Sequence, residues 1–401
     1  MSENGKIEAV IVAGARTPIG TAFKGTLRNT TAMELAEVVV KEVQKRSGLD
    51  VSQIDDIILA ESNYGGGDIA RHAAVVAGML QVPGQSVNRH CAGSLTAIGN
   101  AAATVMAGAE KAVIAGGTQS SSTGPVQKFR KPGSVDEFIE KWMPPTHPDT
   151  AEAPNMDMSI TVGWNTARDA DLTREEMDAW AVRSQNRAVA AIESGAFKDE
   201  IVPVPVLQAD GTFVDFDTDE HPRSGSTLER LATLKTLHPE IDNFSITAGN
   251  ASGINDAAAA VMVVSSELAA EAGLETLATV KAWAASADHP ARTGMIVLDV
   301  IPKVLERAGI SIEDVALWEI NEAFAAVPVA ACKKLGINEE IVNTAGSGCS
   351  LGHPVAASGA RMIITLMNEL RRRGGGYGVA AMCAGGGQAG AVVIEVPAPK
   401  H

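Results

Sequence analysis

The sequence predicts an α/β protein built from two similar halves, with a lobe inserted into the first half. Apolar, strand-like segments alternate with helical segments toward both ends of the chain, which is typical of covered sheets. Residues 48–61 (GLDVSQIDDIILAE) align without a gap with residues 309–322 (GISIEDVALWEINE), which indicates an internal repeat. From about residue 121 to 249, proline and charged residues interrupt the alternation.

Individual elements follow from local patterns in the same order. A buried strand ending in a turn is expected at residues 8–18, a helix stopped by Gly48 at 31–48, and a second strand at 55–62. A helix within the lobe is expected at 173–195, and the strand pattern returns at 251–266. We therefore expect a first half at residues 1–120 that is completed by about 250–272. The inserted lobe is expected at 121–249 and the second half at 273–401.

Size and charge exclude several classes of protein. A chain of 401 residues exceeds the usual single domain of roughly 100 to 200 residues. The net charge of -15 at pH 7 argues against broad nucleic-acid or anionic-membrane surfaces. No apolar run approaches the roughly 20 residues needed to cross a bilayer, and the N-terminal segment does not resemble a signal peptide. These features predict a cytoplasmic protein.

Cysteine is used sparingly, and Cys91 lies where a strand-like segment meets an Ala-rich helical one. The four cysteines show no CxxC spacing, which predicts free thiols and no metal site. A helix start or a neighbouring histidine can lower a thiol pKa and so activate it. The offset of the internal repeat places Cys91 within one residue of His353. We therefore expect both residues at equivalent helix starts that face each other, although Cys91 alone also suits a small buried position.

Four segments resemble, in order, the active-site blocks of the thiolase family. They are NRHCAGS at 88–94, NEAFAAV at 321–327, LGHP at 351–354 and CAGGGQ at 383–388. Residues 13–20 and 247–260 are also similar to family segments, so the resemblance spans nearly the whole chain. It implies the thiolase fold, a layered αβαβα arrangement. It also implies an acyltransferase that forms or cleaves 3-ketoacyl-CoA, with coenzyme A and acyl-CoA as substrates and no permanently bound cofactor or metal.

The resemblance implies a role for each reacting group. Cys91 would be the nucleophile that carries the acyl group, and His353 the base that activates it. Because the carbon–carbon bond chemistry passes through an enolate, Cys383 would be the second proton-transfer group. The N–H groups of Gly385 and Cys91 would form one oxyanion hole, and His353 with a water held by Asn321 would form the other. Pro354 is expected in the first turn of the following helix.

Substrate contacts follow from the same resemblance. Ser252 would lie beside the thioester arm, Phe324 would line the acyl pocket, and Arg223 would bind near the nucleotide end of coenzyme A. Phe324 and the 140–165 region are expected to set the acyl chain length. Family members imply a homodimer or homotetramer. Without the resemblance, Asn321 also suits a turn or cap, Arg223 an ordinary solvated side chain, and Cys383 a packing position.

The sequence departs from the family at several positions. Gly93 and Ser94 stand where Ser-Gly is usual, and Ala389 stands where Gly is usual. Residues 159–167 (SITVGWNTA) replace a Thr-Ala-Glu-Asn-type stretch and place Trp164 near the usual acid. None of these positions is a reacting group, so the departures leave the acyl specificity and the physiological direction open.

Other functions fit the sequence less well. Ser350 lies in a G-x-S-x-G segment typical of serine hydrolases, but no Asp follows it, and the later histidines are only His353 and His401. Residues 385–390 match a dinucleotide-binding fingerprint, yet too few residues follow for its helix and strand. Two alternatives stay open: another condensing enzyme of the thiolase superfamily, which Cys383 disfavours, and a non-catalytic acyl-CoA-binding protein. Retention of all four reacting groups disfavours the second.

Overall fold

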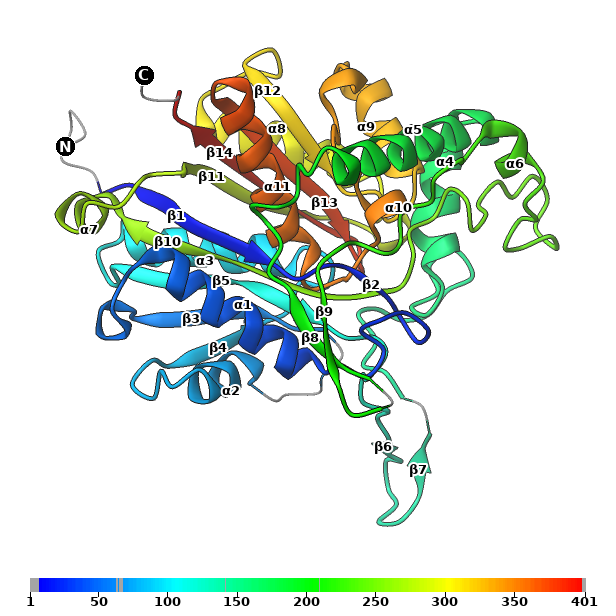
Figure 1. Cartoon of the computed structure of the whole chain (residues 1–401). Coiled ribbons are helices and arrows are strands. Elements are labelled where there is room, and N and C mark those ends of the chain that lie inside the picture. The colour runs from blue at the N-terminus through cyan, green and yellow to red at the C-terminus, as the bar shows by residue number, and fades with distance from the viewer. Residues whose placement is uncertain (1–6, 63, 65–67, 141, 209, 399–401) are drawn as a thin grey trace.

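The structure, a computed structural model, describes residues 7–62, 64, 68–140, 142–208 and 210–398. Within these residues, strands from both halves form one mixed sheet that crosses the molecule (Figure 1). The strands are, in spatial order, β12 (Val315–Ile320), β13 (Gly376–Ala384), β14 (Gln388–Val396), β11 (Ala278–Ala287), β1 (Ala9–Arg16), β10 (Asn255–Ser265), β5 (Ala112–Gln119), β3 (Asp56–Ala60) and β4 (Gly84–Val87), with β2 (Gly20–Thr21) beside β10.

The sheet confirms the predicted duplication. In the first half the order β1-β10-β5-β3 combines two antiparallel pairings with one parallel pairing, and β11-β14-β13-β12 repeats this pattern in the second half. The halves join where β1 and β11 pair antiparallel through Val10–Thr279 and Ile11–Ala278. The aligned repeat segments therefore end in equivalent strands, β3 and β12.

Two helices form the middle layer between the halves. The helices α3 (Gly93–Met106) and α11 (Ser358–Arg373) each contact strands of both halves. Their apolar side chains share one core with the facing side of the strands of both halves; Leu95 and Ile363, for example, are almost fully buried. Burying each such side chain stabilises the fold by about 1.5–3 kcal/mol.

The outer helices cover the opposite face of each half, so the two halves of the sheet form two layers between three helical layers, as the αβαβα prediction requires. The first half is covered by α1 (Ala32–Ser47) and α2 (Ile69–Val76), and the second by α8 (Val297–Ala308), against which α9 (Ala326–Leu335) packs. Local chemistry explains α1: the Thr31 hydroxyl accepts from Glu34 N at 3.2 Å, and Glu34 in turn accepts from Thr31 N at 2.7 Å. The helix ends at Gly48 with φ of 71°, as its sequence predicts.

The region between β5 and β10 is irregular, and its hairpin β6–β7 projects away from the sheet (Figure 1). Its elements are β6 (Phe129–Arg130), β7 (Phe138–Ile139), the π-helix η2 (Ser159–Trp164), α4 (Asn165–Asp169), α5 (Arg174–Glu193), β8 (Val204–Leu207), β9 (Phe213–Phe216) and α6 (Leu228–Ala232). Buried Arg16 anchors this region to β1 by ion pairs with Glu200 and Asp219.

Short elements connect the layers. They are η1 (Val51–Gln53), α7 (Ser266–Glu271), η3 (Pro290–Arg292), η4 (Glu339–Ile341) and α10 (Gly348–Leu351). Among the described helices, none combines the length and apolar character that crossing a membrane requires. We retain the division at residues 120, 249 and 272 as a proposal; its terminal segments 1–6 and 399–401 lie outside the described residues.

Candidate active site

The two candidate cysteines and Asn321 each lie at or just after the carboxyl end of a strand of the sheet. Cys91 lies between β4 and α3, Cys383 is the next-to-last residue of β13, and Asn321 follows β12 directly. Because β12 and β13 are parallel, their carboxyl ends meet, and Asn321 N donates to Ala381 O at 3.0 Å. Burial and then the negative charge that Cys91 carries when ionised raise the pKa of Cys383. The two thiols are therefore close enough for the charge of Cys91 to affect the pKa of Cys383.

The main-chain N–H groups of Gly385 and of Cys91 itself favour negative charge on the Cys91 sulfur. Burial has the larger and opposite effect and raises the pKa of Cys91 to about 11. This corrects the expectation that the helix start would lower the thiol pKa. The fold removes the sulfur from water more effectively than two N–H groups can compensate, so the resting group is a neutral thiol.

The starts of α3 and α11 face each other, as the repeat predicts. The Ser94 hydroxyl accepts from Ala360 N at 3.0 Å and so links the first turns of the two helices. A Cβ atom added at Gly93 would lie 2.7 Å from Ala60 Cβ. The Gly93-Ser94 departure therefore fits the packing at this point: the glycine allows a close approach to β3, and the serine caps α11.

The helix starts differ in one predicted detail. The helix α11 begins at Ser358, so the expectation that Pro354 lies in its first turn is wrong. The intervening residues form a turn in which Pro354 O accepts from Ala357 N and Ser358 N, each at 2.9 Å. This turn places His353 five residues before its helix, whereas Cys91 lies only two residues before α3.

His353 is held so that one ring nitrogen is available. Its main-chain N donates to Asn255 Oδ1 at 3.0 Å, and its Nδ1 lies 2.7 Å from Ser358 Oγ. Because the Ser358 hydroxyl also donates to Pro354 O at 2.9 Å, it accepts the hydrogen of Nδ1. The opposite nitrogen, Nε2, then has a lone pair, is buried and has no partner within the described residues.

Burial and, second, the charge of Arg361 lower the pKa of His353 to about 4. The imidazole is therefore neutral at pH 7. A neutral imidazole with an unused Nε2 lone pair is suited to accept a proton.

Asn321 is completely buried, yet the fold makes little use of its side chain. Its Nδ2 lies 3.5 Å from His353 Nδ1, which is a long contact, and its Oδ1 has no partner within the described residues. The side chain caps no helix, because α9 begins only at Ala326. An unsatisfied buried amide is costly, so this geometry suits a group that binds a water or a ligand.

The next residue, Glu322, shows the opposite behaviour. Its carboxylate accepts from Trp180 Nε1 at 2.8 Å, Ser184 Oγ at 2.6 Å, Asn343 Nδ2 at 2.8 Å and Cys349 N at 3.0 Å. It is fully buried and ties the lobe helix α5 to the second half. Glu322 therefore fixes the segment that carries Asn321, and Cys349 acts as a packing residue beside it.

Ser350 occupies a structural position. Its side chain is completely buried, and its hydroxyl lies 2.7 Å from Ser184 Oγ and 3.2 Å from Ser347 O. No histidine is bonded to this hydroxyl in the part of the chain that the structure describes, which agrees with rejecting the hydrolase alternative. Within the same residues, no group of three or more His, Cys, Asp or Glu side chains is placed to hold a metal ion.

Two of the three predicted substrate contacts lie together. Ser252 N donates to Ala323 O at 2.9 Å, and Ala251 pairs with Phe324, so Ser252 and the Phe324 ring belong to adjoining segments. Phe324 is only 8% exposed, so its ring packs inside the protein and can line a buried pocket. These contacts connect the 250–255 loop to the segment that follows Asn321.

Arg223 lies further away, at the rim of the lobe. Its main-chain N donates to Gln185 Oε1 at 2.8 Å. Burial, followed by the charges of Arg223 and Lys24, lowers the pKa of nearby His221 to about 4. The His221 ring packs against Gly253, where an added Cβ would lie 2.4 Å from it. The structure thus places Arg223 beside the loop that carries Ser252, without contact to the reacting groups.

The glycine run after Cys383 is packed on several sides. Gly386 and Gly387 have φ of 81° and 73°, and added Cβ atoms would lie 2.8 Å from Thr146 Cβ and 2.2 Å from Asp288 O, respectively. At Gly385 an added Cβ would lie 3.6 Å from His90 Cγ, an ordinary contact. The last two glycines are therefore required by the backbone, whereas Gly385 is distinguished by the N–H that it directs to Cys91.

Sequence reasoning missed two residues of this site, Asn255 and Ser358. A histidine that acts through one ring nitrogen needs a partner at the other, so a serine five residues after His353 was a usable signal. Asn255 gave no such signal, because it lies 98 residues from His353 in sequence.

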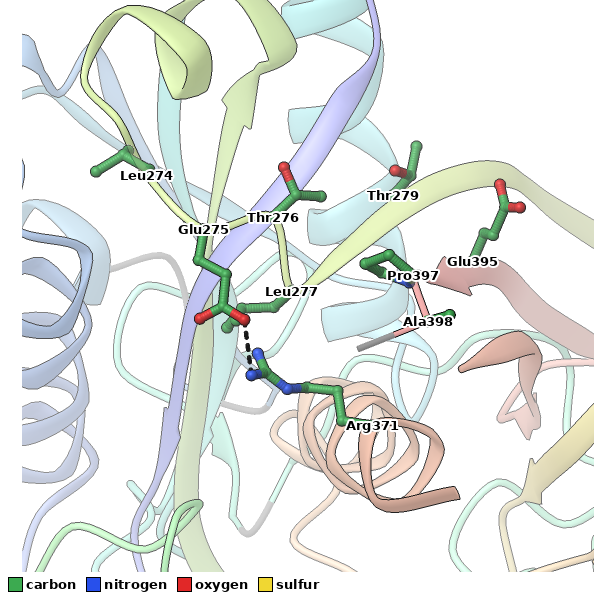
Figure 2. A pocket seen from close by; sticks show the side chains of 9 residues that line it. All are labelled: Leu274, Glu275, Thr276, Leu277, Thr279, Arg371, Glu395, Pro397 and Ala398. Atoms are coloured by element: carbon green, nitrogen blue, oxygen red, sulfur yellow. Dashed lines mark hydrogen bonds and ion pairs between the residues drawn. The ribbon is translucent and has the colours of Figure 1, made fainter. Parts of the chain in front are cut away.

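A separate groove of about 690 Å³ lies elsewhere on the molecule (Figure 2). It includes Thr279 at the start of β11, Glu395 near the end of β14, and Arg371 of α11, which forms an ion pair with Glu275 at 2.8 Å. Glu395 pairs with Tyr377 at the beginning of β13, so this groove is at the opposite end of the sheet from Cys383. It contains none of the candidate catalytic residues.

Known proteins of one family are similar to this chain over nearly its whole length. Residues 9–267 match the thiolase N-terminal domain, and residues 274–396 match the thiolase C-terminal domain. Acetyl-CoA acetyltransferase of Pseudomonas aeruginosa is 38% identical over 96% of this chain and 99% of the relative. The 3-oxoadipyl-CoA/3-oxo-5,6-dehydrosuberyl-CoA thiolase of Escherichia coli (strain K12) is 38% identical over 97% of this chain and 99% of the relative.

A solved structure is similar as well. The crystal structure of the Bacillus anthracis acetyl-CoA acetyltransferase superposes with a TM-score of 0.89 at 37% sequence identity. The match covers 98% of this chain and 100% of that chain.

Proposed function

The chain belongs to the thiolase family of acyltransferases, and we propose that it transfers acyl groups to and from coenzyme A through a thioester on Cys91. One set of observations supports this assignment of the nucleophile. The N–H groups of Gly385 and Cys91 favour negative charge on the Cys91 sulfur, that charge acts on Cys383, and the buried Nε2 of His353 has no partner within the described residues. The other condensing enzymes of the thiolase superfamily do not require a second reactive cysteine, so Cys383 favours a thiolase.

The first half-reaction begins with neutral groups. His353 Nε2 takes the proton of Cys91, and the resulting thiolate attacks the 3-keto carbon of the substrate, forming the S–C bond. The N–H groups of Cys91 and Gly385, which favour negative charge at the Cys91 sulfur, stabilise the negative oxygen that forms beside it. The C2–C3 bond then breaks, the acyl group stays on Cys91, and acetyl-CoA leaves as its enolate.

Cys383 supplies the proton that the enolate needs. Its pKa is raised by burial, so the thiol yields its proton only to a strongly basic carbanion. In the second half-reaction the Cys383 thiolate takes the proton of incoming coenzyme A, whose sulfur attacks the acyl-cysteine. The S–C bond to Cys91 breaks, and the Cys91 thiolate recovers its proton from His353.

The remaining candidate residues bind substrate in this proposal. Asn321 Oδ1, buried and without a partner in the described residues, would hold the water of the second oxyanion hole together with His353. Ser252 would contact the thioester arm, and Phe324 would line the acyl pocket. Arg223, which together with Lys24 adds positive charge around His221, would bind near the nucleotide end of coenzyme A. The substrates are thus acetoacetyl-CoA or longer 3-ketoacyl-CoA esters, and no bound cofactor enters any step.

The setting of the enzyme is part of the same proposal. We expect a cytoplasmic homodimer or homotetramer that acts in fatty acid metabolism, including β-oxidation. Size-exclusion chromatography with light scattering tests the oligomeric state.

The experiment that tests the function uses the purified full chain. Addition of coenzyme A to acetoacetyl-CoA should cause loss of acetoacetyl-CoA absorbance and formation of acetyl-CoA. Incubation with acetyl-CoA alone should leave one acetyl group on the peptide containing Cys91, and Cys91→Ser should abolish this label. If the enzyme turned over substrate but the acetyl group was found on another residue, that residue and not Cys91 would be the nucleophile. Absence of turnover with every 3-ketoacyl-CoA would favour a non-catalytic acyl-CoA-binding protein.

A further inference from the structure

The segment that departs from the family pattern forms the π-helix η2, and both of its ends are fixed to other parts of the chain. Asp157, just before it, accepts from Ser159 N at 3.0 Å and from His238 Nε2 at 2.8 Å. Asn165, just after it, donates to Ala291 O at 3.0 Å. Short π-helices occur frequently at functional sites. One residue of η2 lies against Phe324, the proposed wall of the acyl pocket.

The contact is between Gly163 and Phe324. A Cβ atom added at Gly163 would lie 2.9 Å from Phe324 Cδ1, 3.0 Å from Phe324 Cγ and 3.0 Å from Ile246 Cγ1. Ile246 is fully buried and Phe324 is almost so, so an added Cβ would strain this contact until one of the side chains moved. The Phe324 ring therefore occupies space that any side chain at position 163 would take.

The surroundings decide which group would move if position 163 gained a side chain. Trp164, the next residue of η2, is held by a ring contact, since its ring centroid lies 5.4 Å from that of Phe244, which in turn lies 5.0 Å from that of His238. The backbone beside Phe324 is also fixed, because Ala325 N donates to Asn250 O at 2.9 Å. The ring of Phe324 is the part that would be displaced, away from η2.

We propose that Gly163 is a specificity-determining residue, because its missing side chain lets the Phe324 ring rest against η2 and leaves room for acyl chains longer than that of acetoacetyl-CoA. This inference rests on the proposed function, in which Phe324 lines the acyl pocket. It narrows the expected chain-length region, residues 140–165, to one position. It also gives the departure at residues 159–167 a role in substrate choice rather than in the chemistry.

The test compares two substrates in four proteins. The kcat/KM values for 3-ketodecanoyl-CoA and acetoacetyl-CoA are measured for wild type, Gly163→Ala, Phe324→Leu and the double variant. Gly163→Ala should lower the ratio of long to short substrate by about tenfold or more, since a methylene-sized change in an apolar pocket has effects of this order. Phe324→Leu should raise the ratio, and the double variant should return it to within about threefold of wild type.

Gly99→Ala is the matched control. An added Cβ at Gly99 in α3 would lie 2.7 Å from Trp283 Cδ1, a similar clash with an aromatic ring, but Trp283 is not a substrate residue. This variant should lower the melting temperature and leave the substrate ratio unchanged. A change in the ratio as large as that in Gly163→Ala would show a general effect of core strain and overturn the proposal.

Other outcomes also decide the matter. An unchanged ratio in folded Gly163→Ala, or a double variant that does not recover the ratio, would contradict the proposal. If Gly163→Ala does not fold, the test uses Phe324→Leu alone. An unchanged ratio of long to short substrate in that variant would contradict the proposal. A wild-type enzyme that turns over acetoacetyl-CoA but no longer ester would overturn the specificity inference alone. Absence of all turnover would instead overturn the proposed function.

Discussion

The segments that precede α3 and α11 occupy equivalent places in the two halves, yet they hold their functional side chains by different means. The Cys91 sulfur is contacted by main-chain N–H groups, one of them from Gly385. The His353 ring and backbone are instead held by the side chains of Ser358 and Asn255. The duplicated fold thus supplies two equivalent backbone positions. The groups that surround the nucleophile and the base differ, because a thiol and an imidazole need different hydrogen-bond partners.

The same physical cause acts on both segments with opposite sign. Burial disfavours a charged group, so it raises the pKa of the Cys91 thiol to about 11 and lowers the pKa of the His353 imidazole to about 4. The resting pair is therefore a neutral thiol and a neutral base rather than an ion pair. Proton transfer is expected only when a substrate supplies the carbonyl that stabilises the product of attack.

The largest effect is expected when the first segment loses its sulfur. Cys91→Ser should reduce thiolysis by about a thousandfold or more, because a hydroxyl does not replace the thiol as nucleophile without further activation. Steady-state turnover of acetoacetyl-CoA measures this loss, and the melting temperature shows whether the fold is retained. Activity within tenfold of wild type in a folded variant would contradict the assignment of Cys91.

The second segment should be sensitive to Ser358. Ser358→Ala removes the partner that fixes the hydrogen of His353 Nδ1, so kcat should fall about tenfold to a hundredfold with little change in KM. Ser358→Thr, which keeps the hydroxyl, should recover most of the activity.

Ser350→Ala is the control for Ser358→Ala. Ser350 is equally buried and hydrogen-bonded but does not contact His353, so its loss should affect stability more than kcat. Equal losses of kcat in the two alanine variants would show that Ser358 has only a structural role.

The pH dependence tests the base directly. A lowered pKa means that His353 remains unprotonated as pH falls from 8 to about 5, and activity should be lost only as pH falls through about 4. The folded protein binds this proton more weakly than the unfolded chain, so stability should also decrease from about pH 6.5 toward 4. Short assays with melting temperatures at each pH separate the two effects. An acid limb near pH 6.5, without unfolding, would contradict the buried neutral base.

Alkylation tests the state of the thiol in the first segment. The iodoacetamide reaction of Cys91 should still increase with each pH unit above 7, because the pKa is raised to about 11. Cys332, whose pKa burial raises to about 12, should react more slowly at each pH. Peptide mass spectrometry after limited labelling gives both rates. If the labelling rate of Cys91 instead reached a plateau near neutral pH, Cys91 would be an activated thiolate. The conclusion that Cys91 and His353 are both neutral at rest would then be wrong.

The smallest effect is expected within the glycine run that serves the first segment. Gly386→Ala combines a positive φ with a contact of 2.8 Å to Thr146, and it should lower the free energy of unfolding by about 1–3 kcal/mol. Gly385→Ala meets only an ordinary 3.6 Å contact with His90 and should change this free energy by less than about 0.5 kcal/mol. Urea unfolding measures both values. Equal destabilisation would mean that Gly385 is also held by strain.

Much of the molecule could be read along the chain. The cap at Thr31, the stop at Gly48 and the apolar periodicity between them are local, so they specify α1 without knowledge of the rest of the fold. The ordered segments around Cys91 and Cys383 likewise identify the family, and the repeat identifies the duplicated architecture. The cap and periodicity were readable because they act between residues close in sequence, and the motifs and the repeat were readable because they are patterns of residue order.

The tertiary structure alone decided how the site is built and what its groups are at rest. Asn255 reaches His353 across 98 residues, and Gly163 meets Phe324 through packing of separate segments. The raised pKa of Cys91 reverses the sequence-based expectation, because burial depends on everything that surrounds the sulfur. Periodicity and motif order are local properties of a chain, whereas burial, electrostatic neighbours and steric limits arise only when distant segments pack together.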